Sequence, residues 1–104
     1  MDVVLLYFDG CPNWQVADWQ VADERLHEAL ARAGRSDVRV QRRQVVTPAE
    51  ADAVGFRGSP TVLVDGRDPF ADPDATVGLS CRVYRSTVGP AGAPTVEQLF
   101  EPLR

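Results

Sequence analysis

The residue with the clearest chemistry is Cys11, which follows a run of apolar residues, Val3 to Phe8. A continuous apolar run of this length predicts a strand that is covered on both faces. Pro12 favours the first turn of a helix, so Cys11 is expected between the carboxyl end of a buried strand and the amino end of a helix. Free amide groups and the helix dipole favour a thiolate there, whereas the adjacent Asp9 carboxylate opposes it. This pattern predicts a nucleophilic thiol at Cys11; the alternative is a small residue that closes the turn.

Composition excludes several classes of function. The 104 residues are 44% hydrophobic and 25% charged, a composition typical of one globular domain over residues 1–104. The net charge of −4 argues against a protein that binds nucleic acid or an anionic membrane. We recognise no signal peptide or membrane span, and two distant cysteines do not make a secreted disulfide framework, so a cytoplasmic protein is expected. The chain has no Lys and a single His, which excludes lysine chemistry and any site that needs two imidazoles.

The hydrophobic pattern predicts an α/β protein with the element order β-α-β-α-β-β-α. The expected elements are a strand over 3–8, a helix over 13–33, a strand over 38–46, a helix over 48–54, strands over 61–64 and 79–85, and a helix over 95–103. Thr47 and Thr95 are expected to cap the second and third helices, and residues 86–94 are expected to form a loop. Strands joined by a helical crossover must be parallel, whereas the closing pair should be antiparallel.

The long helical segment holds a tandem repeat, WQVAD, which begins at Trp14 and again at Trp19. Five residues advance a helix by about 500°, so the two copies face about 140° apart. Trp19 is in phase with the predicted core stripe, so Trp14 is expected toward solvent or toward Cys11. We interpret the repeat as a short duplication that lengthened the first turns of the helix; the alternative is that Trp14 covers the thiol of Cys11.

The element order and two short motifs resemble the thioredoxin-like superfamily over nearly the whole chain. Cys11-Pro12 matches the glutaredoxin-type start of the thiol motif, and Ser59-Pro60-Thr61 matches the loop whose proline is cis in that family. The resemblance implies a four-stranded mixed sheet flanked by helices, a cis Pro60 beside Cys11, and a Ser59 backbone that hydrogen-bonds a thiol substrate. Trp14 stands where a dithiol enzyme has its second cysteine, so the implied activity is that of a monothiol protein without a cofactor.

The chain is also similar to small bacterial proteins that carry GSPTVLVDG and GLSC, some of which are classed as alkylmercury-lyase-like. That similarity implies soft thiolate ligands, here Cys11 and Cys81, with Asp9 as an acid. In the usual strand order of the thioredoxin family, Cys81 would lie about 9–10 Å from the first strand, whereas a disulfide needs Cα atoms within about 7 Å. We therefore expect Cys81 to be a small hydrophobic residue on the face of Leu79 and Val83, with a second thiol as the alternative.

Three functions follow from these observations. The first is a thiol–disulfide oxidoreductase in which Cys11 forms a mixed disulfide with a small thiol or a protein thiol. The second is a non-catalytic thioredoxin-fold module that binds a partner through Trp14 and the Pro60 surface. The third is a protein that handles a thiophilic metal or an organomercurial through Cys11 and Cys81, without a resident metal. The residues expected to contact the substrate are Pro12, Trp14, Arg57, Ser59 and Pro60; Arg57 would attract a carboxylate.

Overall fold

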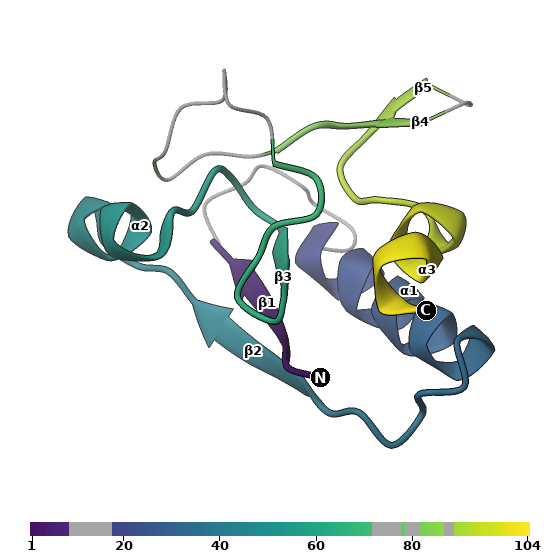
Figure 1. The fold of residues 1–104 in the computed structure, drawn as a ribbon. Helices are drawn as coiled ribbons and strands as arrows, with labels where there is room; N and C mark the ends of the chain where they lie inside the picture. Colours follow the sequence, from purple (N-terminus) through teal and green to yellow (C-terminus); the bar gives the residue numbers. More distant parts are fainter. Residues whose placement is uncertain (9–17, 72–77, 79–81, 87–88) are drawn as a thin grey trace.

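The computed structural model describes residues 1–8, 18–71, 78, 82–86 and 89–104. The elements follow the order β1 (Val3–Tyr7), α1 (Asp18–Arg32), β2 (Val40–Gln44), α2 (Pro48–Val54), β3 (Thr61–Val64), β4 (Tyr84–Ser86), β5 (Gly89–Ala91) and α3 (Val96–Leu103) (Figure 1). The chain is therefore a mixed α/β protein, as predicted. Within the described ranges, none of the helices has the length and apolar character needed to cross a membrane.

β1 is the middle strand of a three-stranded mixed sheet with the order β2-β1-β3. β2 pairs with β1 in parallel, from Val3 opposite Val40 to Tyr7 opposite Gln44, which confirms the predicted crossover through α1. β3 pairs with β1 antiparallel, with Leu6 opposite Thr61 at the end of the pairing. Because the carboxyl end of β1 meets the amino end of β3, the segments that follow β1 and precede β3 leave the sheet at the same edge.

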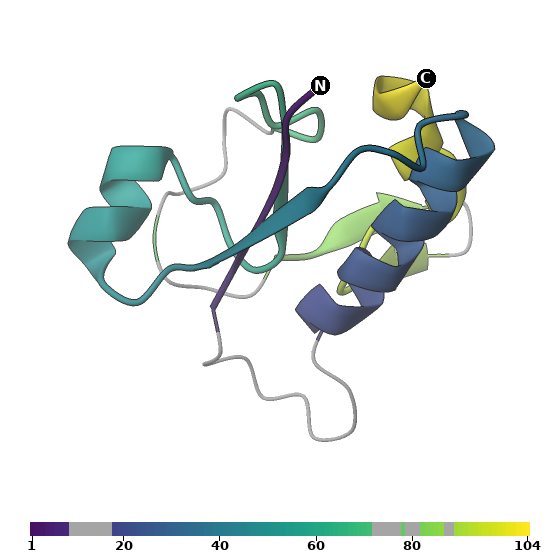
Figure 2. The same cartoon turned by 90° about the horizontal axis from the view of Figure 1, so that it is seen from below.

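Helices cover both faces of this sheet, which explains why β1 is a continuous apolar run (Figures 1 and 2). On one face, Val3 and Leu5 pack into a core cluster with residues of α1, β3 and α3. On the other face, Leu6 packs with Val45, Phe56 and Ala51 of α2. The first strand is thus buried from both sides, as the sequence predicted.

Both ends of α2 and the start of α3 lie where local chemistry predicts. The Oγ1 atom of Thr47 accepts a hydrogen bond from the backbone N–H of Glu50, and Gly55 closes α2 with a left-handed φ of 67°. Thr95 and Gln98 form the predicted capping box at the start of α3. Along α1, the buried stripe contains Ala22, Leu26, Ala29 and Leu30, whereas His27 is exposed.

The end of the chain differs from the predicted order. β4 pairs antiparallel with β5 in a separate two-stranded sheet, so part of the segment expected to be a loop over 86–94 is a strand. β5 was missed because Gly89-Pro90-Ala91 has low strand propensity; a proline is tolerated where a strand has a free edge. Within the described ranges, the sheet that contains β1 has three strands and no fourth.

In the described part of the last predicted strand, Tyr84 is buried and Val83 is exposed. The exposed fraction is 66% at Val83 and 4% at Tyr84. The predicted inward face, formed by Leu79, Cys81 and Val83, is wrong at Val83, which is exposed. Tyr84 is buried instead because its ring packs against Phe70 and its hydroxyl donates to the Pro60 carbonyl. Leu79 and Cys81 themselves lie outside the described residues.

Candidate functional site

The predicted cis-proline loop precedes β3, and the peptide bond between Ser59 and Pro60 is cis, as the resemblance implied. All four residues of the loop, Gly58 to Thr61, are buried. The hydroxyl of Thr61 donates a hydrogen bond to the Gly58 carbonyl at 2.7 Å and so closes the loop on itself. The loop is therefore part of the packed interior of the protein at the edge where β1 ends.

Ser59 connects this loop to the end of β1. The register of the β1–β3 pairing, continued by two residues, places Phe8 opposite Ser59. The backbone N–H of Phe8 donates to the Ser59 hydroxyl at 3.0 Å. Pro60 lacks an N–H and cannot donate to the ladder, and the Phe8 N–H is accepted by a side-chain hydroxyl rather than by a backbone carbonyl. Sequence analysis assigned Ser59 a backbone role and missed this use of its hydroxyl.

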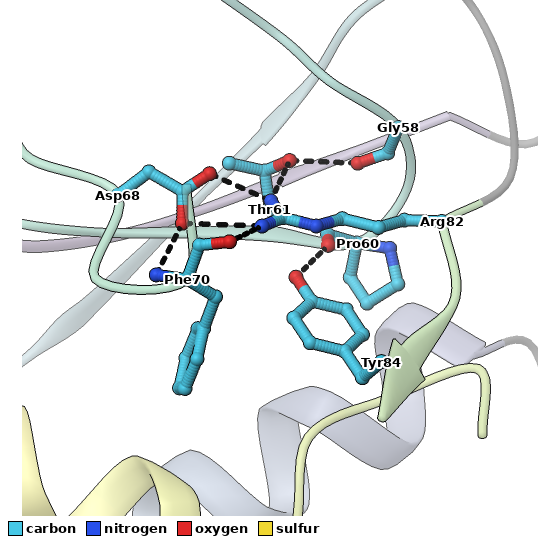
Figure 3. Close-up of polar contacts among 7 residues, drawn as sticks. All are labelled: Gly58, Pro60, Thr61, Asp68, Phe70, Arg82 and Tyr84. Carbon is cyan, nitrogen blue, oxygen red and sulfur yellow. Dashed lines mark hydrogen bonds and ion pairs between the residues drawn. The ribbon is translucent and has the colours of Figure 1, made fainter. Parts of the chain in front are cut away.

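The Arg82 side chain lies beside Thr61 of the loop and reaches Asp68 and Phe70 (Figure 3). The backbone N–H of Arg82 donates to the Ser59 carbonyl at 3.0 Å. The guanidinium forms an ion pair with Asp68, with 2.6 Å between Nη1 and Oδ2, and donates to the Phe70 carbonyl at 2.5 Å. Nη1 also lies 3.4 Å from the Thr61 hydroxyl oxygen. One buried side chain therefore links the loop to the turn at residues 68–70.

Tyr84 completes the same cluster. Its hydroxyl donates to the Pro60 carbonyl, and the centre of its ring lies 4.7 Å from the Arg82 guanidinium carbon. The Phe70 ring meets it edge to face, at 5.5 Å between ring centres. Burial raises the pKa of Tyr84 well above the ordinary value of about 10. Tyr84 is thus a neutral donor that holds the Pro60 carbonyl in place.

Gly58 shows how closely the loop and Arg82 approach each other. A Cβ atom added at Gly58 would lie 2.9 Å from the Cβ of Arg82 and 3.1 Å from its Cα. Gly58 also has a φ of 116°, a conformation that residues with a side chain rarely adopt. Glycine is required here for both reasons.

The remaining predicted site residues divide into two groups. Arg57 is partly buried and immediately precedes Gly58, so it lies beside the loop, and its contact with a substrate carboxylate stays a prediction. Cys11, Pro12, Trp14 and Cys81 lie outside the described residues.

The hydrogen bonds and the ion pair of the described cluster hold the loop in position. Asp68 and Arg82 neutralise each other, and within the described ranges every buried side-chain nitrogen or oxygen has a hydrogen-bond partner. No group of three His, Cys, Asp or Glu side chains in this part of the chain could hold a metal ion. Sequence analysis missed Asp68, Arg82 and Tyr84 because they come from a predicted loop and a predicted strand, and no local motif connects them.

Comparisons with protein families, with curated proteins and with solved structures return no match for this chain. The site is therefore interpreted from its own geometry and chemistry.

The close contact at Gly58 leads to a prediction about stability. We expect Gly58→Ala to lower the free energy of unfolding by about 2–4 kcal/mol, because it combines a strained φ with an overlap against the Arg82 backbone. The matched control is Gly34→Ala, where φ is also positive, at 71°, but no atom lies within 4 Å of the added Cβ; a cost of about 1 kcal/mol is expected there. Urea unfolding measures both, and equal losses would show that the contact with Arg82 is unimportant.

The pKa of Tyr84 predicts how alkaline pH affects stability. The folded protein holds the phenol proton more tightly than the unfolded chain does. The contribution of the protonated Tyr84 to the free energy of unfolding is therefore complete below about pH 10 and is lost as the pH rises toward the folded pKa. Titration of the Tyr7→Phe variant, which leaves Tyr84 as its only tyrosine, should show no tyrosinate absorbance near pH 10 while the protein is folded. Ionisation near pH 10 with unchanged circular dichroism would contradict the assignment.

Proposed function

We propose that this chain is a thioredoxin-like monothiol protein that carries out thiol–disulfide exchange with Cys11 as the nucleophile. The observation that carries the proposal is the 3.0 Å hydrogen bond from the Phe8 N–H to the Ser59 hydroxyl, which holds the carboxyl end of β1 against the loop that contains Pro60. Cys11 follows Phe8 by three residues, so chain length alone keeps its Cα within about 11 Å of the Phe8 Cα. A substrate bound at the loop would therefore lie within reach of the Cys11 segment.

The arrangement of the sheet supports the same proposal. β1 is central, with a parallel neighbour on one side and an antiparallel neighbour on the other, and helices cover both faces. This order is what the resemblance to the thioredoxin-like superfamily implies for the first three strands. The proposal includes a fourth strand in this sheet. Residues 79–81, in which that strand was expected to begin, lie outside the described part of the chain.

The proposed reaction is an exchange between sulfur atoms. The Cys11 thiolate attacks one sulfur of a substrate disulfide, a mixed disulfide forms, and the other substrate sulfur leaves as a thiolate. A second thiolate then attacks the mixed disulfide and regenerates Cys11. Because Trp14 occupies the position of a neighbouring resolving cysteine, this second thiolate would come from a small thiol or a protein thiol, with Pro12, Trp14 and Arg57 beside it.

A specific observation favours a second candidate, in which Cys81 is a second thiol. Cys81 is bonded directly to Arg82, whose N–H donates to the Ser59 carbonyl, and the segment before Cys11 is held by the Ser59 hydroxyl. The two cysteine-bearing segments are therefore anchored on one serine. The earlier expectation that Cys81 lies too far from Cys11 assumed an additional strand of the β1 sheet, which the described strands do not include. Cys81 would then either resolve Cys11 or share a thiophilic metal or organomercurial with it.

The alkylation rate of Cys11 as a function of pH tests the first proposal. In the Cys81→Ser variant, Cys11 is the only cysteine, and we expect its pKa to lie well below the ordinary value of about 8.5, because a reactive thiolate requires it. The Cys11→Ser variant serves as the control for Cys81. A Cys11 thiol with an unshifted pKa, or one that does not react, would contradict the enzymatic proposal and would leave a non-catalytic binding module.

Treatment with glutathione disulfide tests the second candidate. If Cys81 resolves Cys11, the wild-type protein should release glutathione and end with an internal disulfide, two hydrogens lighter than the reduced protein, whereas Cys81→Ser should stop at the mixed disulfide. Mass spectrometry under non-reducing conditions distinguishes the two products. A wild-type protein that retains glutathione on Cys11 would exclude Cys81 as the resolving thiol.

A further inference from the structure

We propose that Arg82 is a positioning residue: its side chain fixes the Ser59–Pro60 loop against the end of β1, and through that loop it sets the reactivity of Cys11. The inference rests on the proposed function of Cys11, but the position of the loop can be measured without reference to any activity. Arg82 is connected to Phe8 in three steps: its side chain holds its backbone, its backbone N–H holds Ser59, and the Ser59 hydroxyl holds Phe8.

The first step is the fixation of Arg82 by its own side chain. The exposed fractions of the Arg82 and Asp68 side chains are 9% and 11%, so their 2.6 Å ion pair is largely shielded from water. The guanidinium is planar and donates in fixed directions, here to Asp68 and to the Phe70 carbonyl, while its face lies over Tyr84. A buried ion pair is a weak source of net stability, but its geometry fixes the direction of the side chain strictly.

The second step leads from Arg82 to both carbonyls of the loop. The Arg82 N–H donates to the Ser59 carbonyl, and the hydroxyl of Tyr84, two residues further along the chain, donates to the Pro60 carbonyl. Gly58 packs directly on the Cβ of Arg82. A displacement of Arg82 therefore either moves the loop or leaves buried carbonyls without donors, which is costly.

The third step leads from the loop to β1. Ser59 has an exposed fraction of 2%, and its hydroxyl is the acceptor for the Phe8 N–H. Because its carbonyl and its hydroxyl are held by two different segments, Ser59 transmits any shift of Arg82 to the residue that leads into the Cys11 segment. The charge of Arg82 is balanced by Asp68, so Arg82 acts on Cys11 by fixing positions rather than by direct attraction.

The test uses variants of the full chain in the Cys81→Ser background, so that Cys11 is the only thiol. Arg82→Met removes the guanidinium, and Arg82→Lys keeps the charge but loses the planar fork. Ser59→Ala removes the acceptor for Phe8 and leaves Arg82 intact. The matched control is Arg85→Met, because Arg85 lies nearby on β4 but is exposed.

Two measurements are made on each variant: hydrogen exchange of the Phe8 amide and the pH profile of Cys11 alkylation. Exchange of the Leu26 amide, in the buried stripe of α1, serves as the reference for overall stability. Loss of one hydrogen bond corresponds to about tenfold faster exchange. In Arg82→Met and Ser59→Ala, we expect this increase at Phe8 relative to Leu26 and a shifted pH profile of Cys11 alkylation. Arg82→Lys should show both effects to a smaller extent, and Arg85→Met should show neither.

Two results would overturn the inference. If Phe8 and Leu26 exchange faster by the same factor in Arg82→Met, the role of Arg82 is structural only. If Phe8 responds but the Cys11 profile does not move, the loop has no influence on the thiol. Failure of the proposed function is recognised separately, because an unshifted pKa of Cys11 in the parent protein would contradict that function while the exchange of Phe8 still reports on the loop.

Discussion

Two hydrogen bonds to one buried serine hold the candidate site in its present form. The regular pairing of β1 with β3 ends at Leu6 and Thr61, so the Phe8 N–H, which lies beyond it, needs another acceptor. The Ser59 hydroxyl supplies that acceptor, and the Ser59 carbonyl accepts from Arg82. Three segments that are distant in the sequence therefore meet at a single residue. The position of the loop relative to the end of β1 depends on this junction.

The surrounding electrostatics keep the junction rigid rather than reactive. Arg82 and Asp68 form a closed pair, and the Tyr84 phenol remains protonated because burial raises its pKa. The Tyr84 phenol is therefore not set up to transfer a proton at neutral pH. Under our proposal, the reactive group at this edge of the sheet is the thiol of Cys11.

Local signals in the sequence were sufficient for much of the fold. The apolar run of β1, the caps at Thr47 and Thr95, and the Ser-Pro-Thr motif each determine a short stretch of chain, and each was predicted correctly. The cluster of Asp68, Arg82 and Tyr84 was not predicted, because its members are joined only by tertiary contacts that no short motif encodes. The prediction that Val83 is buried was wrong because tertiary contacts decide which face of the last strand is covered. Tyr84 is buried by its contacts with Phe70 and Pro60.

The central claim is that Cys11 lies beside Pro60 at the Ser59 junction, and nuclear Overhauser effects in the reduced, isotope-labelled protein test it most directly. The account predicts cross-peaks between the β protons of Cys11 and the ring protons of Pro60, and predicts that they weaken in Ser59→Ala. If Cys11 instead gives cross-peaks to other residues and none to Ser59 or Pro60, the thiol does not lie at this loop, and the proposed function is wrong.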